Sequence, residues 1–409
     1  MIFFQKHLPA LDFLEDLEQF IPFRTDILLE RMLPQLDASD RPAFRSLRRL
    51  LADRFHYEYH VVLESLKNDF VPFDPDRETL AEPDYSREEL QTRRTRLSTS
   101  LRDILQTGNY RELTPEQLTE CLRMQPVGGL SVHVDTRDFD GFHVYYRGIR
   151  KRQETAGKYF FFRKRNRSMM FLNRVFVIAK FKEEHGGQVL IKMFKDVAVE
   201  NIKIIAPKVR LGMPVFDRLK IGGSVIGSLI APVSKLIFAF TLSWVYFFVI
   251  LGGLLLAAFK GMMSFLNSRN KYMQRFSSSL YYRNLSNNNA AITTLLDAAE
   301  NQELKEMLLG YFLLYLHRER TMTMQELDAA VEQWIAVQFG HRLNFEVDDA
   351  VRKLVQKGIV SVSREISHSS DSADGHEVYQ ALGLAESLRR LDTDWDHFNN
   401  YNHCSQDKV

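Results

Sequence analysis

Residues 221–259, IGGSVIGSLIAPVSKLIFAFTLSWVYFFVILGGLLLAAF, form the most apolar stretch of the sequence and carry one formal charge, Lys235. Its last part, residues 236–259, is uncharged and mostly apolar. Because a helix rises about 1.5 Å per residue, this part would reach roughly 36 Å and cross a hydrocarbon core about 30 Å thick. The sequence therefore predicts a membrane-spanning segment.

The charges beside this segment favour a hairpin of two spans over a single span at 236–259. A hairpin over 219–266 would place both flanking basic clusters on the cytoplasmic face, as the positive-inside rule requires. Gly223 and Gly227 stand at GxxxG spacing, which predicts close packing of the two helical arms. The flanking cations are equal in number: Lys203, Lys208, Arg210, Arg218 and Lys220 before the segment, and Lys260, Arg269, Lys271, Arg275 and Arg283 after it.

The rest of the 409 residues has the composition of water-soluble protein, with 26% of the chain charged. The net charge of +2 hides a strong asymmetry. Residues 1–146 hold 26 acidic and 18 basic residues, a net −8, whereas residues 147–182 hold 12 basic residues and one acid, a net +11. Positive charge of this density indicates an anionic partner or a strongly solvated surface.

The cysteine content and the N-terminus indicate the redox compartment and the kind of targeting signal. With only Cys121 and Cys404, the chain has neither a disulfide framework nor a cysteine-based zinc motif, which fits a reducing compartment. The N-terminus lacks the basic and apolar regions of a secretory signal and is too acidic for an organelle transit peptide. We therefore expect the internal apolar segment to direct the chain to its membrane.

Apolar periodicity divides the soluble chain into regions. Residues 1–125 are predicted to be helical, with apolar side chains every three or four positions. Residues 127–207 are rich in β-branched and aromatic residues between turn signals, which predicts a basic antiparallel sheet domain. After a polar linker at 267–289, residues 290–400 show three helical patterns followed by a β-hairpin, the order of a winged helix. We expect an α+β membrane protein with a helical N-terminal region, an antiparallel β-rich middle domain, a transmembrane helical hairpin and a winged-helix-like C-terminal domain.

Three short segments resemble a known family: FVPFDPD at 70–76, KMFKDVAVENIKIIAP at 192–207 and YYRNLSNNNA at 281–290. The chain resembles the uncharacterised membrane-protein family called domain of unknown function 3754, which includes animal transmembrane protein 143. The resemblance covers most of the chain in the same order of regions. It implies a two-span membrane protein, bacterial or organellar. It implies no activity, so no functional residue is carried over.

The basic stretch is the best functional clue in the sequence. Its cations flank the aromatic run at 159–162, and aromatic residues beside cations suit an anionic lipid surface, where each cation adds about 1 kcal/mol. The same composition suits RNA, by stacking and charge, and it also suits a buried strand followed by a solvated loop. The predicted lipid-contacting residues are Arg147, Arg150, Lys151, Arg152, Arg163, Lys164, Arg165 and Arg167.

The sequence offers no catalytic motif, no phosphate or dinucleotide fingerprint, and we expect no cofactor or metal. His56, His60 and Glu64 share one helix face but lack HExxH spacing, so solvent-facing or core-edge positions are the better interpretation. The acidic residues at 135–140 precede a glycine and are more typical of a turn than of an ion site.

The winged-helix-like order raises the question of nucleic-acid binding. The third helix would be the recognition helix, yet its first turns carry Glu346, Asp348 and Asp349. Carboxylates there would face phosphates, against the electrostatics that supply most DNA affinity. The pattern favours protein contact or a structural role for this module.

Together these features predict a non-enzymatic, membrane-anchored scaffold or regulatory protein whose soluble domains lie on one face of an anionic bilayer. One alternative is an enzyme or lipid-handling protein with a site at the bilayer surface, and another is a nucleic-acid-binding membrane regulator. The expected partners are anionic lipids and either a protein bound by the C-terminal domain or a second copy. The expected location is the bacterial inner membrane with cytoplasmic domains, or alternatively a mitochondrial or other organellar membrane.

Overall fold

The protein was analysed as a computed structural model, which describes residues 19–77, 85–124, 131–134, 137, 139–156, 165–185, 187–207, 209–212, 244–365 and 376–406. The chain forms two compact units, each made of separate stretches. The sheet unit comprises Met1–Leu11, Leu113–Val144 and Arg150–Leu285, and the helical unit comprises Asp12–Glu112, Tyr145–Ile149 and Ser286–Val409.

Helix α8 (Asn288–Leu316) lies at the centre of the helical unit. Every residue from Glu306 to Tyr315 is buried, and a helix that is buried all round needs partners on all sides. Those partners come from both ends of the chain and include the helices α1 (Thr25–Met32), α2 (Asp40–Phe70), α3 (Arg87–Thr107), α9 (Met324–Phe339) and α10 (Asp348–Gln356). Helix α11 (Leu384–Gln406) packs against α2.

One hydrophobic core joins the two ends of the chain. Phe44 of α2 packs its ring against Tyr311 and Phe312 of α8, with centroid distances of 6.5 and 5.9 Å. The same core takes in Val351 of α10 and Leu391 of α11. The regions 1–125 and 290–400, expected to be separate, thus contribute to one folding unit.

The C-terminal elements follow the order helix, short strand, two helices and a two-stranded hairpin. Strands β8 (Met322–Thr323), β10 (His376–Ala381) and β9 (Val360–Glu365) form a sheet in the order β8-β10-β9. Capping fixes the helix that follows β8. A capping box of Thr323 and Glu326 starts α9, and Gly340, with φ of 64°, ends it in the left-handed conformation that glycine favours.

The sheet unit is built on the long antiparallel strands β3 (Phe139–Ala156), β4 (Arg165–Phe181) and β5 (Val189–Ala198). They belong to a sheet of order β1-β3-β4-β5-β7, where β1 is Arg111–Glu112 and β7 is Asn284–Asn287. Phe176 of β4 lies opposite Met193 of β5, and both are buried. The further described elements are α4 (Pro115–Arg123), α5 (Ile202–Ile205), the paired strands β2 (Ser131–Val134) and β6 (Val209–Gly212), and short 3₁₀ turns η2 (Leu33–Gln35), η3 (Val71–Phe73), η4 (Glu183–His185) and η5 (Val199–Asn201).

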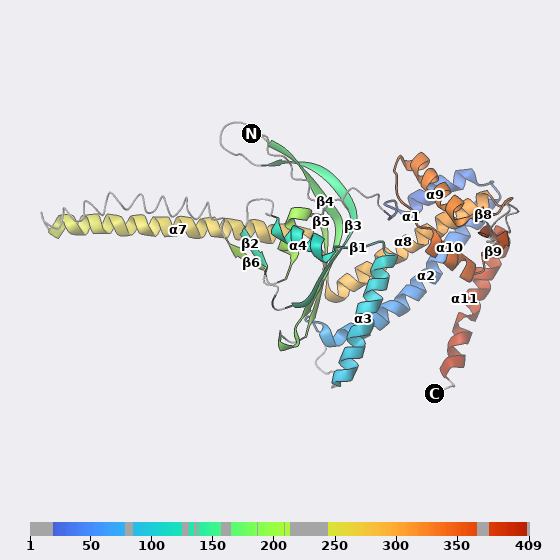
Figure 1. The fold of residues 1–409 in the computed structure, drawn as a ribbon, viewed down its shortest axis with the longest axis horizontal. Helices are drawn as coiled ribbons and strands as arrows, with labels where there is room; N and C mark the ends of the chain where they lie inside the picture. The colour runs from blue at the N-terminus through green and yellow to red at the C-terminus, as the bar shows by residue number, and fades with distance from the viewer. Residues whose placement is uncertain are drawn as a thin grey trace, which may run out of the picture. The chain divides into compact units, whose positions relative to one another are not determined.

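Helix α7 (Trp244–Arg283) corrects the predicted transmembrane hairpin. It runs without a break through the end of the expected second span and through most of the expected polar linker at 267–289 (Figure 1). Within the described part of the chain, the uncharged residues 244–259 of this helix reach roughly 24 Å at about 1.5 Å per residue, which is less than a hydrocarbon core of about 30 Å.

Among the described residues, no helix combines the length and the apolar character needed to span a bilayer. The transmembrane hairpin over 219–266, and with it the membrane-protein part of the expected fold class, is therefore wrong. The described residues form an α+β fold with antiparallel sheets. Residues 219–243, with Gly223 and Gly227, lie outside the described ranges.

A buried ion pair links three helices of the helical unit. Glu303 of α8 is 4% exposed, and Lys353 Nζ of α10 lies 2.7 Å from its Oε1. The hydroxyl of Tyr59, on α2, donates to the other carboxylate oxygen. A carboxylate removed from water needs these partners, because leaving it unpaired is costly.

A second buried carboxylate, Glu306, ties the N-terminal segment to α8. It accepts hydrogen bonds from Gln302 Nε2 at 2.7 Å and Asn109 Nδ2 at 2.8 Å, and burial raises its pKa to about 7. Gln302 Oε1 also accepts from the backbone N–H of Ile21, whose carbonyl accepts from Lys305 Nζ at 3.0 Å. Burial lowers the pKa of Lys305 to about 8.

The pair between Glu303 and Lys353 yields a stability test. We expect Lys353→Met to lower the free energy of unfolding by about 3–5 kcal/mol, because Glu303 loses its cation inside the protein. Arg352→Met is the control, since Arg352 is largely exposed and its ion pair within the described part of the chain is with Asp349 on the same helix, a contact worth about 0–1 kcal/mol. Urea denaturation of both variants measures the difference. Equal losses would contradict the assignment, and Glu303→Gln added to Lys353→Met should restore most of the stability.

Candidate functional site

The outer part of strand β3 presents a run of cations in the sheet unit. Arg150, Lys151 and Arg152 are exposed, and no carboxylate of the described residues pairs with them. Side chains alternate along a strand, so Arg150 and Arg152 share one face and Lys151 has the other. The guanidinium of Arg152 lies 5.1 Å from the ring centroid of Phe171, a cation–π contact that orients it.

The neighbouring strand β4 brings further basic residues to the same end of the sheet. Strands β3 and β4 are adjacent in the strand order, and residues 157–164 connect the end of β3 to the start of β4. Arg165 and Arg167 belong to the first residues of β4. Arg163 and Lys164 lie outside the described residues. We call the exposed group Arg150, Lys151 and Arg152 the basic strand ends.

Arg147, predicted as part of the same surface, belongs instead to the helical unit. Its guanidinium carbon lies 4.7 Å from the ring centroid of Tyr110 and 5.2 Å from that of Phe20. One guanidinium nitrogen donates to the carbonyl of Gly108 at 2.8 Å. Arg147 is therefore engaged in packing, and a linear count of charges could not separate it from its neighbours.

Helix α7 exposes an apolar stripe that the sequence pattern had assigned to a membrane span. We define this stripe by large side chains that are 38–70% exposed and recur mostly every three or four positions. Exposed apolar area of this extent marks a binding surface in soluble proteins. The stripe consists of Val245, Phe248, Leu255, Leu256, Phe259, Met262, Met263 and Leu266.

The charge of α7 complements an anionic surface. The helix contains five basic residues and no aspartate or glutamate. Lys260 and Lys271 are exposed. The sheet unit thus carries exposed cations on a strand and an exposed apolar stripe on a helix that lacks acidic residues.

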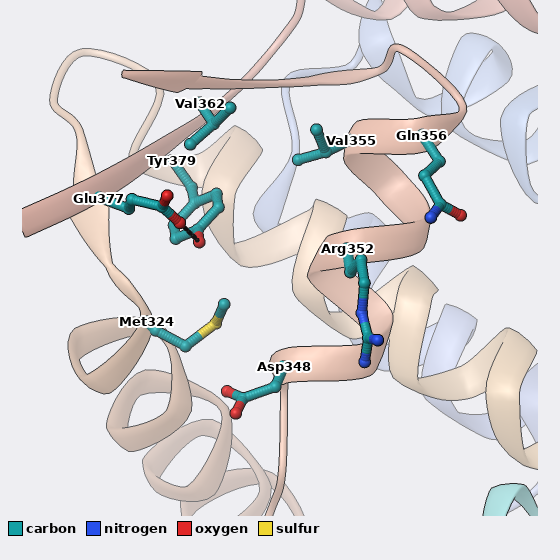
Figure 2. Close-up of a pocket in the computed structure, with 8 residues that line it drawn as sticks. All are labelled: Met324, Asp348, Arg352, Val355, Gln356, Val362, Glu377 and Tyr379. Atoms are coloured by element: carbon teal, nitrogen blue, oxygen red, sulfur yellow. Dashed lines mark hydrogen bonds between the residues drawn. The ribbon is translucent and has the colours of Figure 1, made fainter. Parts of the chain in front are cut away.

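The helical unit contains an open groove of about 520 Å³ between α10 and the β9–β10 hairpin (Figure 2). Tyr379 of β10 lies directly opposite Val362 of β9 in the strand register, and both line the groove. The Tyr379 hydroxyl donates to Glu377 Oε2 at 3.0 Å. The lining residues are Met324, Asp348, Arg352, Val355, Gln356, Val362, Glu377 and Tyr379.

An acidic cluster lies on the helical unit near the base of α10. Burial, followed by repulsion from Glu332, Asp348 and Glu346, raises the pKa of Asp328 to about 6. One carboxylate oxygen of Asp328 is buried without a hydrogen-bond partner among the described residues. The cluster therefore destabilises the fold at neutral pH, where Asp328 is ionised.

Two of the segments that carry the family resemblance meet in the helical unit. Asn289 Nδ2 donates to Asp74 Oδ2 at 2.7 Å, and Asn288 Nδ2 donates to Asp76 Oδ2 at 2.5 Å. Asn288 has a φ of 45°, a conformation that asparagine tolerates better than most residues. These two hydrogen bonds hold the loop after α2 against the start of α8, which is a structural role.

The other sequence candidates do not assemble into a reactive site. His56 is largely exposed, and its Nδ1 lies 3.4 Å from Glu300 Oε2. Within the described part of the chain, no three His, Cys, Asp or Glu side chains group as ligands for a metal. Cys121 is buried, which raises the pKa of its thiol to about 12 and keeps it unreactive. Asp140 is exposed, while Asp135 and Asp138 lie outside the described residues.

Comparison with known families gives one match. Residues 144–290 match the model of a family described as a protein of unknown function (DUF3754). This confirms the resemblance over those residues, which run from β3 to the start of α8. The relation to animal transmembrane protein 143 stays a prediction. No solved structure matches the chain.

The acidic cluster gives a pH-dependent prediction. The pKa of Asp328 is higher in the folded protein than its ordinary value of 3.8, so its contribution to stability is complete below pH about 4 and is lost as pH rises through about 6. Asp328→Asn should therefore raise the free energy of unfolding by about 1 kcal/mol at pH 8, a value reduced because Asp328 is partly solvated.

Thermal unfolding at pH 8 and pH 4 checks this effect. The gain in Tm should be present at pH 8 and absent at pH 4. Asp392→Asn is the matched control, because Asp392 is exposed on α11 and should change Tm little at either pH. A gain of equal size at both pH values would contradict the electrostatic origin.

Proposed function

We propose that this protein is a non-enzymatic scaffold or regulatory protein that acts at an anionic membrane surface, with its sheet unit lying against the lipid headgroups. The observation that carries the proposal is the apolar stripe of α7, exposed on a helix with five basic residues and no acidic one. Helices that lie in the membrane interface combine an apolar face with lysine and arginine.

The free energies available suit reversible binding. Burial of one large apolar side chain contributes about 1.5–3 kcal/mol. Each cation near an anionic surface contributes about 1 kcal/mol, a term that falls off within a Debye length and weakens in salt. Arg150, Lys151 and Arg152 add a second group of exposed cations in the same unit as α7.

The proposal treats α7 as a helix that contacts one leaflet. It needs no catalytic group. A nucleic-acid role finds no support in α10, because Asp348 and Asp349 occupy its first turn.

The charged part of the proposal is tested with three substitutions in the full chain, Arg150→Gln, Lys151→Gln and Arg152→Gln. Co-sedimentation with phosphatidylcholine vesicles, with and without phosphatidylserine, gives the readout. The unmodified chain should bind the anionic vesicles more tightly and lose binding in high salt. The triple variant should bind them at least tenfold more weakly, since three contributions of about 1 kcal/mol are removed.

A matched control removes the same charge elsewhere. Arg31→Gln, Arg45→Gln and Arg49→Gln change three exposed cations of the helical unit and should leave vesicle binding unchanged. Equal binding to neutral and anionic vesicles, or equal losses in the two triple variants, would sink the electrostatic part of the proposal.

The apolar part is tested with Phe248→Ser, Leu255→Ser and Phe259→Ser. These side chains are 55–62% exposed, so the fold should keep its circular dichroism spectrum while binding to both kinds of vesicle falls more than tenfold. The control is Ile27→Ser, Val61→Ser and Val337→Ser, three exposed apolar residues of the helical unit. If the α7 variant binds vesicles normally but changes from an oligomer to a monomer in size-exclusion chromatography, the stripe contacts a second copy instead.

A further inference from the structure

We propose that the groove between α10 and the β9–β10 hairpin binds a segment of a partner protein that carries a lysine or arginine between apolar side chains. The groove belongs to the helical unit and is separate in its residues from the vesicle-binding surface proposed for the sheet unit. The test of this inference therefore does not depend on whether the protein binds vesicles.

The apolar residues of the groove come from three elements. Met324 starts α9, Val355 lies on α10, and Val362 faces Tyr379 across the β9–β10 pair (Figure 2). Val362 is 45% exposed, so apolar area remains open to solvent. Methionine adapts its shape to different partners, which suits a groove that receives side chains from another chain.

Two carboxylates give the groove its charge. Asp348 lies at the start of α10 and pairs with no cation among the described residues. Glu377 is held by the hydroxyl of Tyr379 at 3.0 Å, and its nearest cation, Arg364, is 3.9 Å away and largely exposed. The groove therefore offers two acceptors to an incoming ammonium or guanidinium group.

Arg352, the cation among the described residues that line the groove, is already neutralised. Arg352 donates to Asp349 Oδ1 at 2.8 Å, one turn earlier on the same helix. Charge complementarity thus favours a basic segment over an acidic one or a phosphate. The acidic neighbours Asp328, Glu332 and Glu346 add to the same negative field.

The test uses a library of random twelve-residue peptides displayed on phage, selected against the folded full chain. We expect enriched peptides to contain lysine or arginine between apolar residues. The matched target carries Asp348→Asn and Glu377→Gln, two exposed positions whose substitution should leave thermal unfolding nearly unchanged. This target should not enrich the same peptides.

The best enriched peptide is then made with a fluorescent label and titrated by anisotropy. Its affinity should fall at least tenfold for the Asp348→Asn/Glu377→Gln chain and for a peptide with glutamine in place of its basic residue. A chain with Asp392→Asn and Asp396→Asn, which removes two exposed carboxylates of α11, should bind normally.

Several results would overturn the proposal. One is a selection that enriches no peptide or only peptides without a basic residue. Another is a result in which the α11 control substitutions weaken peptide binding as much as Asp348→Asn/Glu377→Gln does. Binding of duplex DNA that is lost with Arg352→Gln would show that the face recognises phosphates instead. Vesicle binding that survives while peptide binding fails would overturn this inference alone, and the reverse result would overturn only the proposed membrane role.

Discussion

The helical unit depends on the burial of α8 on every side. A helix with this composition cannot be stable beside solvent, so it requires neighbours in all directions. Those neighbours are supplied by both ends of the chain: Phe44 and Leu47 from α2, and Val351 and Leu354 from α10. The buried Glu303 also links α8 to both groups, because it pairs with Lys353 of α10 and accepts a hydrogen bond from Tyr59 of α2.

This constraint explains why domain boundaries drawn along the sequence differ from the compact units. The helices after residue 290 follow the order of a winged helix, but their core is completed by Leu28 of α1 and Phe55 of α2. Short sequence motifs do mark where individual helices begin. A capping box at Thr114 starts α4, and another at Thr323 starts α9. Sharing of one core between distant segments has no local signal, so the sequence alone could not reveal it.

The candidate surfaces show the same division between what a single sequence can and cannot predict. The density of cations after residue 147 draws attention to β3, where Arg150 and Lys151 are exposed. It could not show that Arg147, only three positions earlier, stacks on Phe20 and Tyr110. The sequence showed the apolar run of α7. It did not show that the same helix continues through the polar residues up to Arg283, and no described helix is long and apolar enough to span a membrane. The sequence alone could not predict the groove, because its lining residues come from four separate elements.

The charge asymmetry of the sequence acquires a physical meaning once the residues are placed. The helical unit has two carboxylates, Asp348 and Glu377, in the lining of its groove, and the sheet unit carries exposed cations and a helix without acidic residues. A ligand that suits one surface is repelled by the other: an anionic lipid by the groove, and a basic segment by the basic strand ends. If both proposals hold, the opposite charges of the two units would let the protein bind two different partners without competition for one site. The near-neutral net charge of +2 is the sum of these opposed surfaces and not a sign of weak electrostatics.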